Sequence, residues 1–132
     1  MQRIIAVDPG QHTGLAIFRD EEVEGVFLID GIRGLIATFK AYPPTVVIVE
    51  NFHRQKVATG PQTDTLKMIG AIETLALEHK AEIVTQSPTD RKAWEKEASA
   101  HPAVQAMNAV ARPHVRDAVA HGLRYLALRK SN

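Results

Sequence analysis

Short apolar runs separated by polar turns open the chain and predict strands. Residues 4–7 are apolar and lead directly into Asp8, and after a Pro-Gly turn a second apolar run covers residues 14–18. Two such runs joined by a tight turn predict a hairpin. A polar turn at residues 20–22 and a further run at 23–29 predict a third strand that pairs with the second.

From residue 31 the spacing of apolar residues changes to that of a helix. The apolar positions of residues 31–42 fall three and four apart, and two prolines then end the predicted helix. The β-branched run 45–49 follows, is typical of a strand covered on both faces, and ends at Glu50. A buried strand followed by a carboxylate therefore occurs twice, at Asp8 and at Glu50.

The second half of the chain predicts mainly helices. A polar and basic loop is expected over 51–62, followed by a helix from residue 63 or 64 to about 79 and a strand over 82–86. A short helix containing Arg91, Lys92 and Trp94 comes next. A further helix opens at Pro102 within the Ala-rich segment 98–112, and a last helix covers 114–129. The predicted buried positions of the last helix are Val115, Ala118, Val119, Gly122 and Leu126.

This order of elements predicts an α/β fold with a mixed five-stranded sheet flanked by helices. The first three strands are expected to be antiparallel, and the last two to run parallel to the first. Ligands of such sheets gather at the carboxyl ends of the strands, which is where Asp8 and Glu50 fall. If these two strands are neighbours, the two residues lie about 5 Å apart between backbones.

Composition narrows the class of protein. A chain of 132 residues with 45% hydrophobic residues indicates one globular domain over residues 1–132. Cys is absent, which excludes disulfides and thiolate metal sites and suits a reducing cytoplasm. No apolar stretch approaches the roughly 20 residues of a membrane span and no secretory signal opens the chain, so we expect a cytoplasmic protein with no membrane partner. A net charge of +1 favours no partner by itself.

Ionisable side chains at the two strand ends and on the last helix are the candidate chemistry. An ionised Asp resists burial unless it is paired or binds a metal, although Asp8 can also simply cap its Asp-Pro-Gly turn. His114, Asp117 and His121 stand at i, i+3 and i+7 and share one face of the last helix. The plain alternative is an ordinary polar face, with Asp117 favoured by the helix dipole. His121, one turn further, is expected to pack or to support a neighbouring ligand.

Together, two strand-end carboxylates and a His-x-x-Asp segment can form a site of three or four oxygen and nitrogen ligands. Carboxylate oxygens suit Mg²⁺ or Mn²⁺. Two such ions, about 3.5–4 Å apart, activate a water and stabilise the leaving oxygen in phosphodiester hydrolysis. His114 is then expected either to bind the second ion or to orient or deprotonate the attacking water.

The same residues carry a resemblance to a known family. Three segments are similar, in order, to motifs of the RuvC-type Holliday junction resolvases of the ribonuclease H-like superfamily: Asp8-Pro9-Gly10 with Thr13-Gly14, the strand ending at Glu50, and His114-x-x-Asp117-Ala118. The likeness covers nearly the whole chain. It implies a ribonuclease H-like fold and a crossover junction endodeoxyribonuclease with two Mg²⁺ or Mn²⁺ ions per active site. The implied catalytic and metal-binding residues are Asp8, Glu50, His114 and Asp117.

The resemblance also implies partners. Branched DNA with four arms would be the substrate, and a homodimer built largely on the helix 64–79 would place two symmetric nicks on opposing strands. The short chain indicates a compact phage or prophage version, acting in the cytoplasm of a bacterial or phage-infected cell. In the family an aromatic residue after the Glu strand stacks at the junction centre, and the nearest candidates here are Phe52 and His53, although Phe52 is equally suited to the core.

Basic residues near the expected site are candidate phosphate contacts. Taken singly, each is an ordinary solvated surface charge. Beside the site they would hold a duplex without reading its sequence and would make binding dependent on salt. The residues expected to bind DNA are Phe52, His53, Arg54, Lys56, Arg91, Lys92, Arg112 and Arg116.

The sequence leaves other functions open. Another ribonuclease H-like nuclease, including a YqgF-type relative, would apply the same metal chemistry to flaps, other branched DNA or RNA–DNA hybrids. A non-catalytic nucleic-acid-binding module of the same fold is disfavoured because every acidic position is filled. A phosphate-binding ATPase of the actin or sugar-kinase type needs two domains and a longer chain.

Overall fold

The computed structural model describes residues 1–50 and 60–130 of the chain. The strands are β1 (Arg3–Asp8), β2 (Thr13–Arg19), β3 (Glu22–Ile29), β4 (Val46–Glu50) and β5 (Glu82–Gln86). The helices are α1 (Gly31–Ala41), α2 (Gly60–Glu78), α3 (Pro88–Lys92), α4 (Glu95–Ala100), α5 (Pro102–Gln105) and α6 (Arg112–Lys130). No helix in this part of the chain is both long and apolar enough to cross a bilayer.

The strands of the described residues form one sheet in the order β3-β2-β1-β4-β5. β1 pairs antiparallel with β2, and β2 pairs antiparallel with β3. β4 pairs parallel with β1, and β5 pairs parallel with β4. The predicted mixed sheet is therefore confirmed, with the two apolar strands β1 and β4 at its centre.

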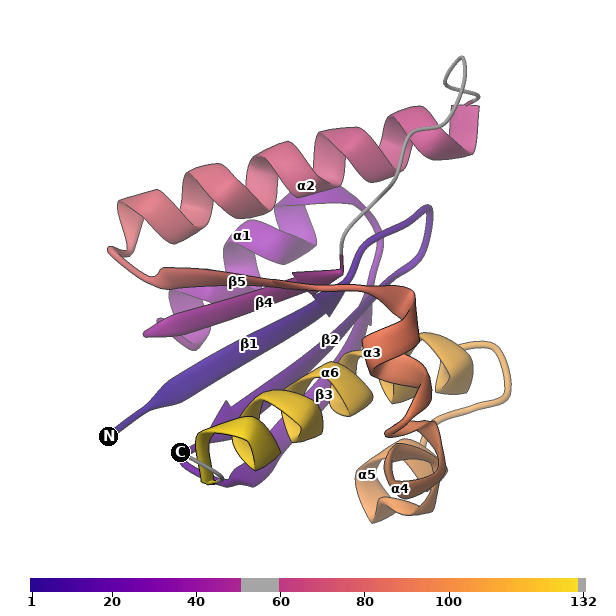
Figure 1. The fold of residues 1–132 in the computed structure, drawn as a ribbon. Coiled ribbons are helices and arrows are strands. Elements are labelled where there is room, and N and C mark those ends of the chain that lie inside the picture. Colours follow the sequence, from indigo (N-terminus) through magenta and orange to yellow (C-terminus); the bar gives the residue numbers. More distant parts are fainter. Residues whose placement is uncertain (51–59, 131–132) are drawn as a thin grey trace.

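Helices cover both faces of the sheet (Figure 1). α1 and α2 lie on one face, and α6 lies on the other together with α3, α4 and α5. Side chains alternate along a strand, so Ile5 and Val7 of β1 pack toward α1 and α2, whereas Ile4 and Ala6 pack toward α6. Asp8 follows Ile4 and Ala6 in this alternation, so its side chain lies on the face that α6 covers.

Helix boundaries differ from the prediction in three places. α2 begins at Gly60, inside the segment predicted as a loop, because Pro at the second helical position needs no hydrogen bond from its nitrogen. The helix predicted around Arg91 is two: α3 begins with a capping box between Ser87 and Asp90 and ends at Lys92, before α4 starts. α6 begins two residues early, with its proline in the first turn. The rest of the predicted loop, residues 51–59, lies outside the described residues.

Candidate active site

Two carboxylates end the neighbouring strands β1 and β4. Val7 pairs with Val49 across these parallel strands, so the next residues along them are Asp8 and Glu50. Each follows, by two positions, an apolar residue that packs toward α6. Their side chains therefore point to the same face of the sheet, which is the juxtaposition that the sequence pattern predicts.

The helix α6 reaches this edge because it packs directly on β2. Gly14 is the register partner of Asp8, and a Cβ at residue 14 would lie 2.2 Å from the carbonyl oxygen of His114. Further along the helix, a Cβ at Gly122 would lie 2.0 Å from Cε1 of Phe18. Both distances are too short for any side chain, so these glycines set how closely α6 approaches the sheet.

Three carboxylates are partly buried here and lie close enough to repel one another. The side chains of Asp8, Glu50 and Asp117 are 15%, 18% and 16% exposed. Burial, followed by the negative charges of Asp117 and Glu50, raises the pKa of Asp8 to about 8, although Arg91 and Arg116 act in the opposite direction. Asp8 therefore keeps its proton near neutral pH unless a further cation joins the site.

Arg91 is the cation that lies among these carboxylates. Its Nε donates to Glu50 Oε1 at 2.7 Å, its Nη1 lies 3.3 Å from Asp117 Oδ1, and Nη1 also donates to Glu95 of α4. Burial alone would raise the pKa of Glu50, but hydrogen bonds from His121 and Arg91, and then the charge of Arg91, hold that pKa below its usual range. Glu50 is therefore ionised.

His114 lies at the edge of the carboxylate cluster. Its Nδ1 is 4.0 Å from Asp8 Oδ2, and its ring centroid is 5.9 Å from that of His12 in the β1–β2 turn. His12 in turn lies 3.2 Å from Asp30 on the exposed surface. His114 is thus a neighbour of Asp8, as expected for a fourth member of the site, and His12 is a histidine that the sequence did not single out.

Sequence reasoning also missed Gln86 and Glu95. Gln86 ends β5 as Glu50 ends β4, and the two residues are register partners. A polar residue at the end of a further apolar strand was the available signal. Glu95 stands four residues after Arg91, a spacing at which helical side chains meet, and that was its signal.

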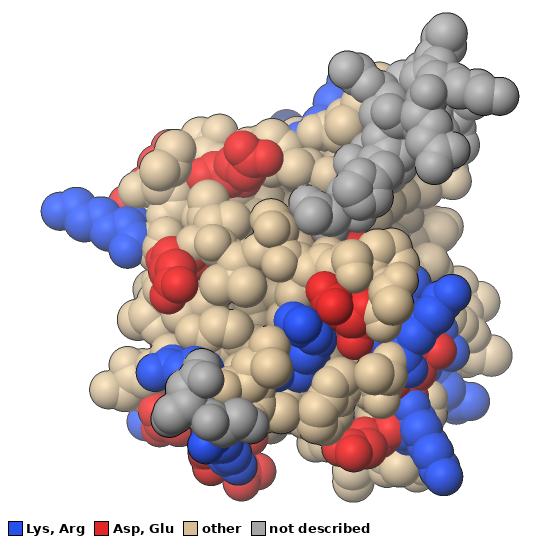
Figure 2. Space-filling view, viewed as in Figure 1, with Lys and Arg blue, Asp and Glu red and all other residues tan. Residues whose placement is uncertain are grey.

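The residues predicted to bind DNA fall into two groups. Phe52, His53, Arg54 and Lys56 lie outside the described residues. In the second group, Lys92 is exposed, whereas the guanidinium groups bind the protein itself: Arg91 to the carboxylates, Arg116 to Asp117 at 2.9 Å, and Arg112 to the carbonyl oxygen of Met107 at 2.8 Å. Figure 2 shows basic and acidic side chains interleaved near α3 and α4 on the face drawn, without a continuous basic field.

The carboxylate cluster suits a hard divalent cation. Among residues 1–50 and 60–130, no three His, Asp or Glu side chains converge closely enough to hold a metal ion. However, Glu50 and Asp117 each turn one oxygen to Arg91, and neither Glu50 Oε2 nor Asp117 Oδ2 has a hydrogen bond to a described residue. Carboxylate oxygens are the donors that Mg²⁺ and Mn²⁺ prefer, and a bound cation relieves the repulsion at Asp8. The donor set therefore fits these ions.

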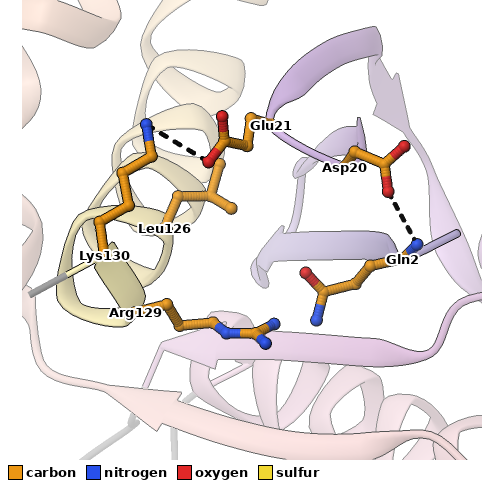
Figure 3. A pocket seen from close by; sticks show the side chains of 6 residues that line it. All are labelled: Gln2, Asp20, Glu21, Leu126, Arg129 and Lys130. Carbon is orange, nitrogen blue, oxygen red and sulfur yellow. Dashed lines mark hydrogen bonds and ion pairs between the residues drawn. The ribbon is translucent and has the colours of Figure 1, made fainter. Parts of the chain in front are cut away.

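A polar hollow of about 320 Å³ lies at the opposite end of the sheet. Figure 3 shows the residues that line it: Gln2, Asp20, Glu21, Leu126, Arg129 and Lys130. Lys130 Nζ lies 3.4 Å from Glu21 Oε1, and these side chains are 64% and 60% exposed. The backbone N–H of Gln2 donates to Asp20 at 2.9 Å. The charges that line this hollow are exposed and paired, and among its described residues there is no group of closely spaced, partly buried carboxylates.

Comparison with known proteins identifies the fold. The sequence matches no protein-family profile and no curated protein sequence. The structure is similar to that of Thermus thermophilus RuvC in complex with a Holliday junction substrate, with a TM-score of 0.71 and 15% identity over 98% of this chain and 96% of that chain. It is also similar to the fowlpox virus resolvase in complex with Holliday junction DNA, with a TM-score of 0.72 and 16% identity over 95% and 99% of the two chains.

A third similar structure is the yeast mitochondrial Holliday junction resolvase. Its TM-score is 0.68, with 11% identity over 98% of this chain and 81% of that chain. The chain therefore has the ribonuclease H-like fold of these proteins, with the same mixed sheet. The predicted resemblance to the RuvC-type resolvases is confirmed at the level of the fold.

Proposed function

We propose that this chain is a metal-dependent, structure-selective DNA endonuclease that resolves four-way (Holliday) junctions by phosphodiester hydrolysis. The observation that carries the proposal is the partly buried cluster of Asp8, Glu50 and Asp117, in which burial, followed by the charges of Asp117 and Glu50, raises the pKa of Asp8 to about 8. Strongly perturbed carboxylates at strand ends are typical of functional sites. The junction substrate is supported by two resolvases of the same fold, each in complex with Holliday junction DNA.

In the proposed reaction the chain's own carboxylates bind the cofactor. Asp8, Glu50 and Asp117 would hold two Mg²⁺ or Mn²⁺ ions through their oxygens, with His114 as the fourth member. Such ions lower the pKa of a bound water and stabilise charge on the leaving oxygen. Asp8 has to give up its proton to take part, and a neighbouring positive charge favours this ionised form. His114, 4.0 Å from Asp8, is suited to orient or deprotonate the attacking water.

The proposed DNA contacts among the described residues lie on α3 and α6. Lys92 of α3 is exposed, and Arg112 and Arg116 lie in the first turns of α6, beside Asp117. Phosphate contacts of this kind hold a duplex in position and carry no sequence information. Phe52, His53, Arg54 and Lys56 remain the contacts that the sequence predicts on the chain after β4. Arg91, whose guanidinium already binds carboxylates, is proposed to act chiefly on the site itself.

A homodimer is the second part of the proposal. α1 and α2 expose apolar side chains: Ile32 is 43%, Ile36 is 47% and Leu77 is 73% exposed. A hollow of about 490 Å³ runs between the two helices and is lined partly by Ile32 and Ile36. Covering such a surface with a second copy would remove apolar area from water and pair two active sites. Paired nicks in opposing strands, made in the cytoplasm of a bacterial or phage-infected cell, are the proposed outcome.

A cleavage assay tests the proposed function. Labelled four-way junction, linear duplex, flap and RNA–DNA hybrid are incubated with the protein in Mg²⁺, in Mn²⁺ or in EDTA. We expect paired nicks in the junction that depend on the metal. Preferential cutting of flaps or hybrids would keep the metal chemistry and replace the substrate. DNA binding without any metal-dependent cutting would contradict the catalytic assignment and indicate a binding module.

A further inference from the structure

Two polar side chains are buried beside Glu50 and have no part in the proposed reaction so far. Gln86 is 2% exposed and His121 is fully buried; with Thr13 they are the buried polar residues of the described chain. A polar group inside a protein costs free energy unless it is hydrogen-bonded. Gln86 and His121 satisfy each other and Glu50, so their burial has a specific partner.

The sheet register brings these residues together. Glu50 and Gln86 are partners across the parallel strands β4 and β5, so their side chains lie next to each other on the face that α6 covers. His121 comes from α6, and its Nδ1 lies 2.7 Å from Gln86 Oε1. The Nε2 of Gln86 donates to the backbone carbonyl of His121 at 3.2 Å. Gln86 is thus hydrogen-bonded to both the ring and the backbone of His121.

The direction of each hydrogen bond follows from these contacts. The amide nitrogen of Gln86 is used on the carbonyl of His121, so its oxygen is the atom that faces Nδ1, and an amide oxygen can only accept. Both partners of the ring are acceptors, so both ring nitrogens donate: Nδ1 to Gln86 Oε1, and Nε2 to Glu50 Oε1 at 3.0 Å. The imidazole is held in one orientation, with its far nitrogen directed at the carboxylate.

The described residues engage one of the two Glu50 oxygens. Oε1 receives both His121 Nε2, at 3.0 Å, and Arg91 Nε, at 2.7 Å. Oε2 has no hydrogen bond to a described residue. Held through one oxygen from two directions, the carboxylate cannot rotate freely, so Oε2 stays directed away from both donors.

We propose that Gln86 and His121 are positioning residues that fix the Glu50 carboxylate so that Oε2 is presented to a divalent cation. The inference rests on the proposed function, because it assigns Glu50 as a metal ligand. Side chains that orient a ligand from behind improve metal affinity, and their loss costs about 10- to 100-fold in affinity or activity. An apolar pair of similar size would fill the same space without the cost of burying polar groups, so packing alone does not account for these residues.

Direct binding of Mn²⁺ to the full chain without DNA tests this inference. Electron paramagnetic resonance of free Mn²⁺ gives the dissociation constant at a temperature where circular dichroism shows each variant to be folded. We expect Gln86→Leu to weaken Mn²⁺ binding about 10-fold or more. His121→Gln, whose amide can still donate toward Glu50, is the conservative variant and is expected to retain most of the affinity that His121→Leu loses. In junction cleavage the Gln86→Leu defect should shrink as Mn²⁺ approaches saturation.

Leu126→Ala provides the matched control, because Leu126 is a buried residue of the same helix at the opposite end of the sheet. It should lower the midpoint of thermal unfolding and leave the Mn²⁺ dissociation constant unchanged. If Gln86→Leu loses stability like Leu126→Ala but binds Mn²⁺ as the wild type does, Gln86 only packs and the inference alone is overturned. If the wild type binds no Mn²⁺, both the proposed function and this inference are contradicted.

Discussion

The two ends of the central sheet carry acidic side chains in opposite circumstances. At the carboxyl ends of β1 and β4, Asp8 and Glu50 are 15% and 18% exposed and lie beside a third carboxylate. At the other end, Glu21 is 60% exposed and pairs with a lysine that is itself 64% exposed. One end therefore brings several carboxyl groups together largely away from water, and the other leaves a single charge pair exposed to it.

This difference in exposure changes what the charges do to the stability of the fold. Hydrated charges change the free energy of folding little, because water stabilises them in the folded and unfolded states alike. A buried carboxylate beside two others destabilises the folded state, since it must either keep its proton or repel its neighbours. The proposed metal site rests on this difference, because a bound cation would remove the cost of the clustered carboxylates.

The largest difference between the two ends should appear in catalysis. Asp8→Asn removes a proposed metal-binding oxygen and should lower junction cleavage by more than about 100-fold, since the loss of outer partners alone costs about 10- to 100-fold. Asp20→Asn makes the same chemical change at the other end, where Asp20 only accepts a backbone hydrogen bond, and should leave the rate unchanged. Initial rates on labelled junction in Mg²⁺ measure both. Full activity of Asp8→Asn would remove Asp8 from the site.

The second difference concerns stability and pH. The pKa of Asp8 rises from 3.8 to about 8 on folding, so between these values the native state holds a proton that the unfolded state has released. Stability then falls as pH rises through this window, by up to about 1.4 kcal/mol per pH unit. Asn at residue 8 is neutral at every pH and removes this slope. In EDTA, Asp8→Asn should therefore be more stable than the wild type at about pH 8, by several kcal/mol at most.

Urea unfolding of both proteins at about pH 5 and about pH 8 measures the effect. Subtracting the two curves cancels the other titrating groups, which the variants share. Mg²⁺ should stabilise the wild type more than Asp8→Asn, because it neutralises the charge that Asn lacks. Equal stability of the two proteins across this range would mean that Asp8 is as well hydrated as Glu21.

Removing Arg91 should be the next largest change. Arg91→Met leaves Glu50, Glu95 and Asp117 without their shared cation. These side chains are partly buried, so the loss should lie between the about 1 kcal/mol of an exposed pair and the about 3–5 kcal/mol of a fully buried one. Unfolding by urea in EDTA measures the loss, and added Mg²⁺ should restore part of it. A loss below about 1 kcal/mol would indicate that Arg91 behaves as a surface charge.

Close packing of α6 on β2 gives a smaller effect that links the fold to the site. Gly14→Ala would drive a methyl group against the backbone of His114 and should cost about 1–3 kcal/mol while reducing cleavage. Gly70→Ala in α2 meets no atom within 4 Å and should be neutral or stabilise the helix by up to about 1 kcal/mol. Thermal unfolding compares the two variants, and equal midpoints would show that α6 can shift away from Gly14 freely.

Local patterns predicted much of this geometry. The apolar runs of β1 and β4 place Asp8 and Glu50 at the ends of two buried strands, and the buried stripe of α6 fixes the orientation of Asp117 beside it. Each of these features depends on spacing within one element, which a sequence displays directly. The start of α2 was mistaken because Gly60 and Pro61 are as typical of a loop as of a helix N-terminus.

Patterns within one element could not predict the contacts between elements that are distant in the sequence. Arg91 on a short helix after a strand has the sequence features of a surface base, and its use by Glu50 depends on packing between residues 41 positions apart. The contact between Gln86 and His121 spans 35 positions. A single sequence carries no sign of which distant polar groups will meet, because that depends on how α3 and α6 settle on the sheet.

The smallest expected effect tests the hydrated end of the sheet. Lys130→Met removes the partner of Glu21, but the two groups are 3.4 Å apart and mostly exposed, so water and salt already screen their attraction. The free energy of unfolding should fall by less than about 0.5 kcal/mol at low salt. At high salt even this difference should vanish, because the wild-type pair is then screened as well. A salt-independent loss above about 1 kcal/mol would show that this end also holds charge away from water, and burial of charge would no longer distinguish the two ends.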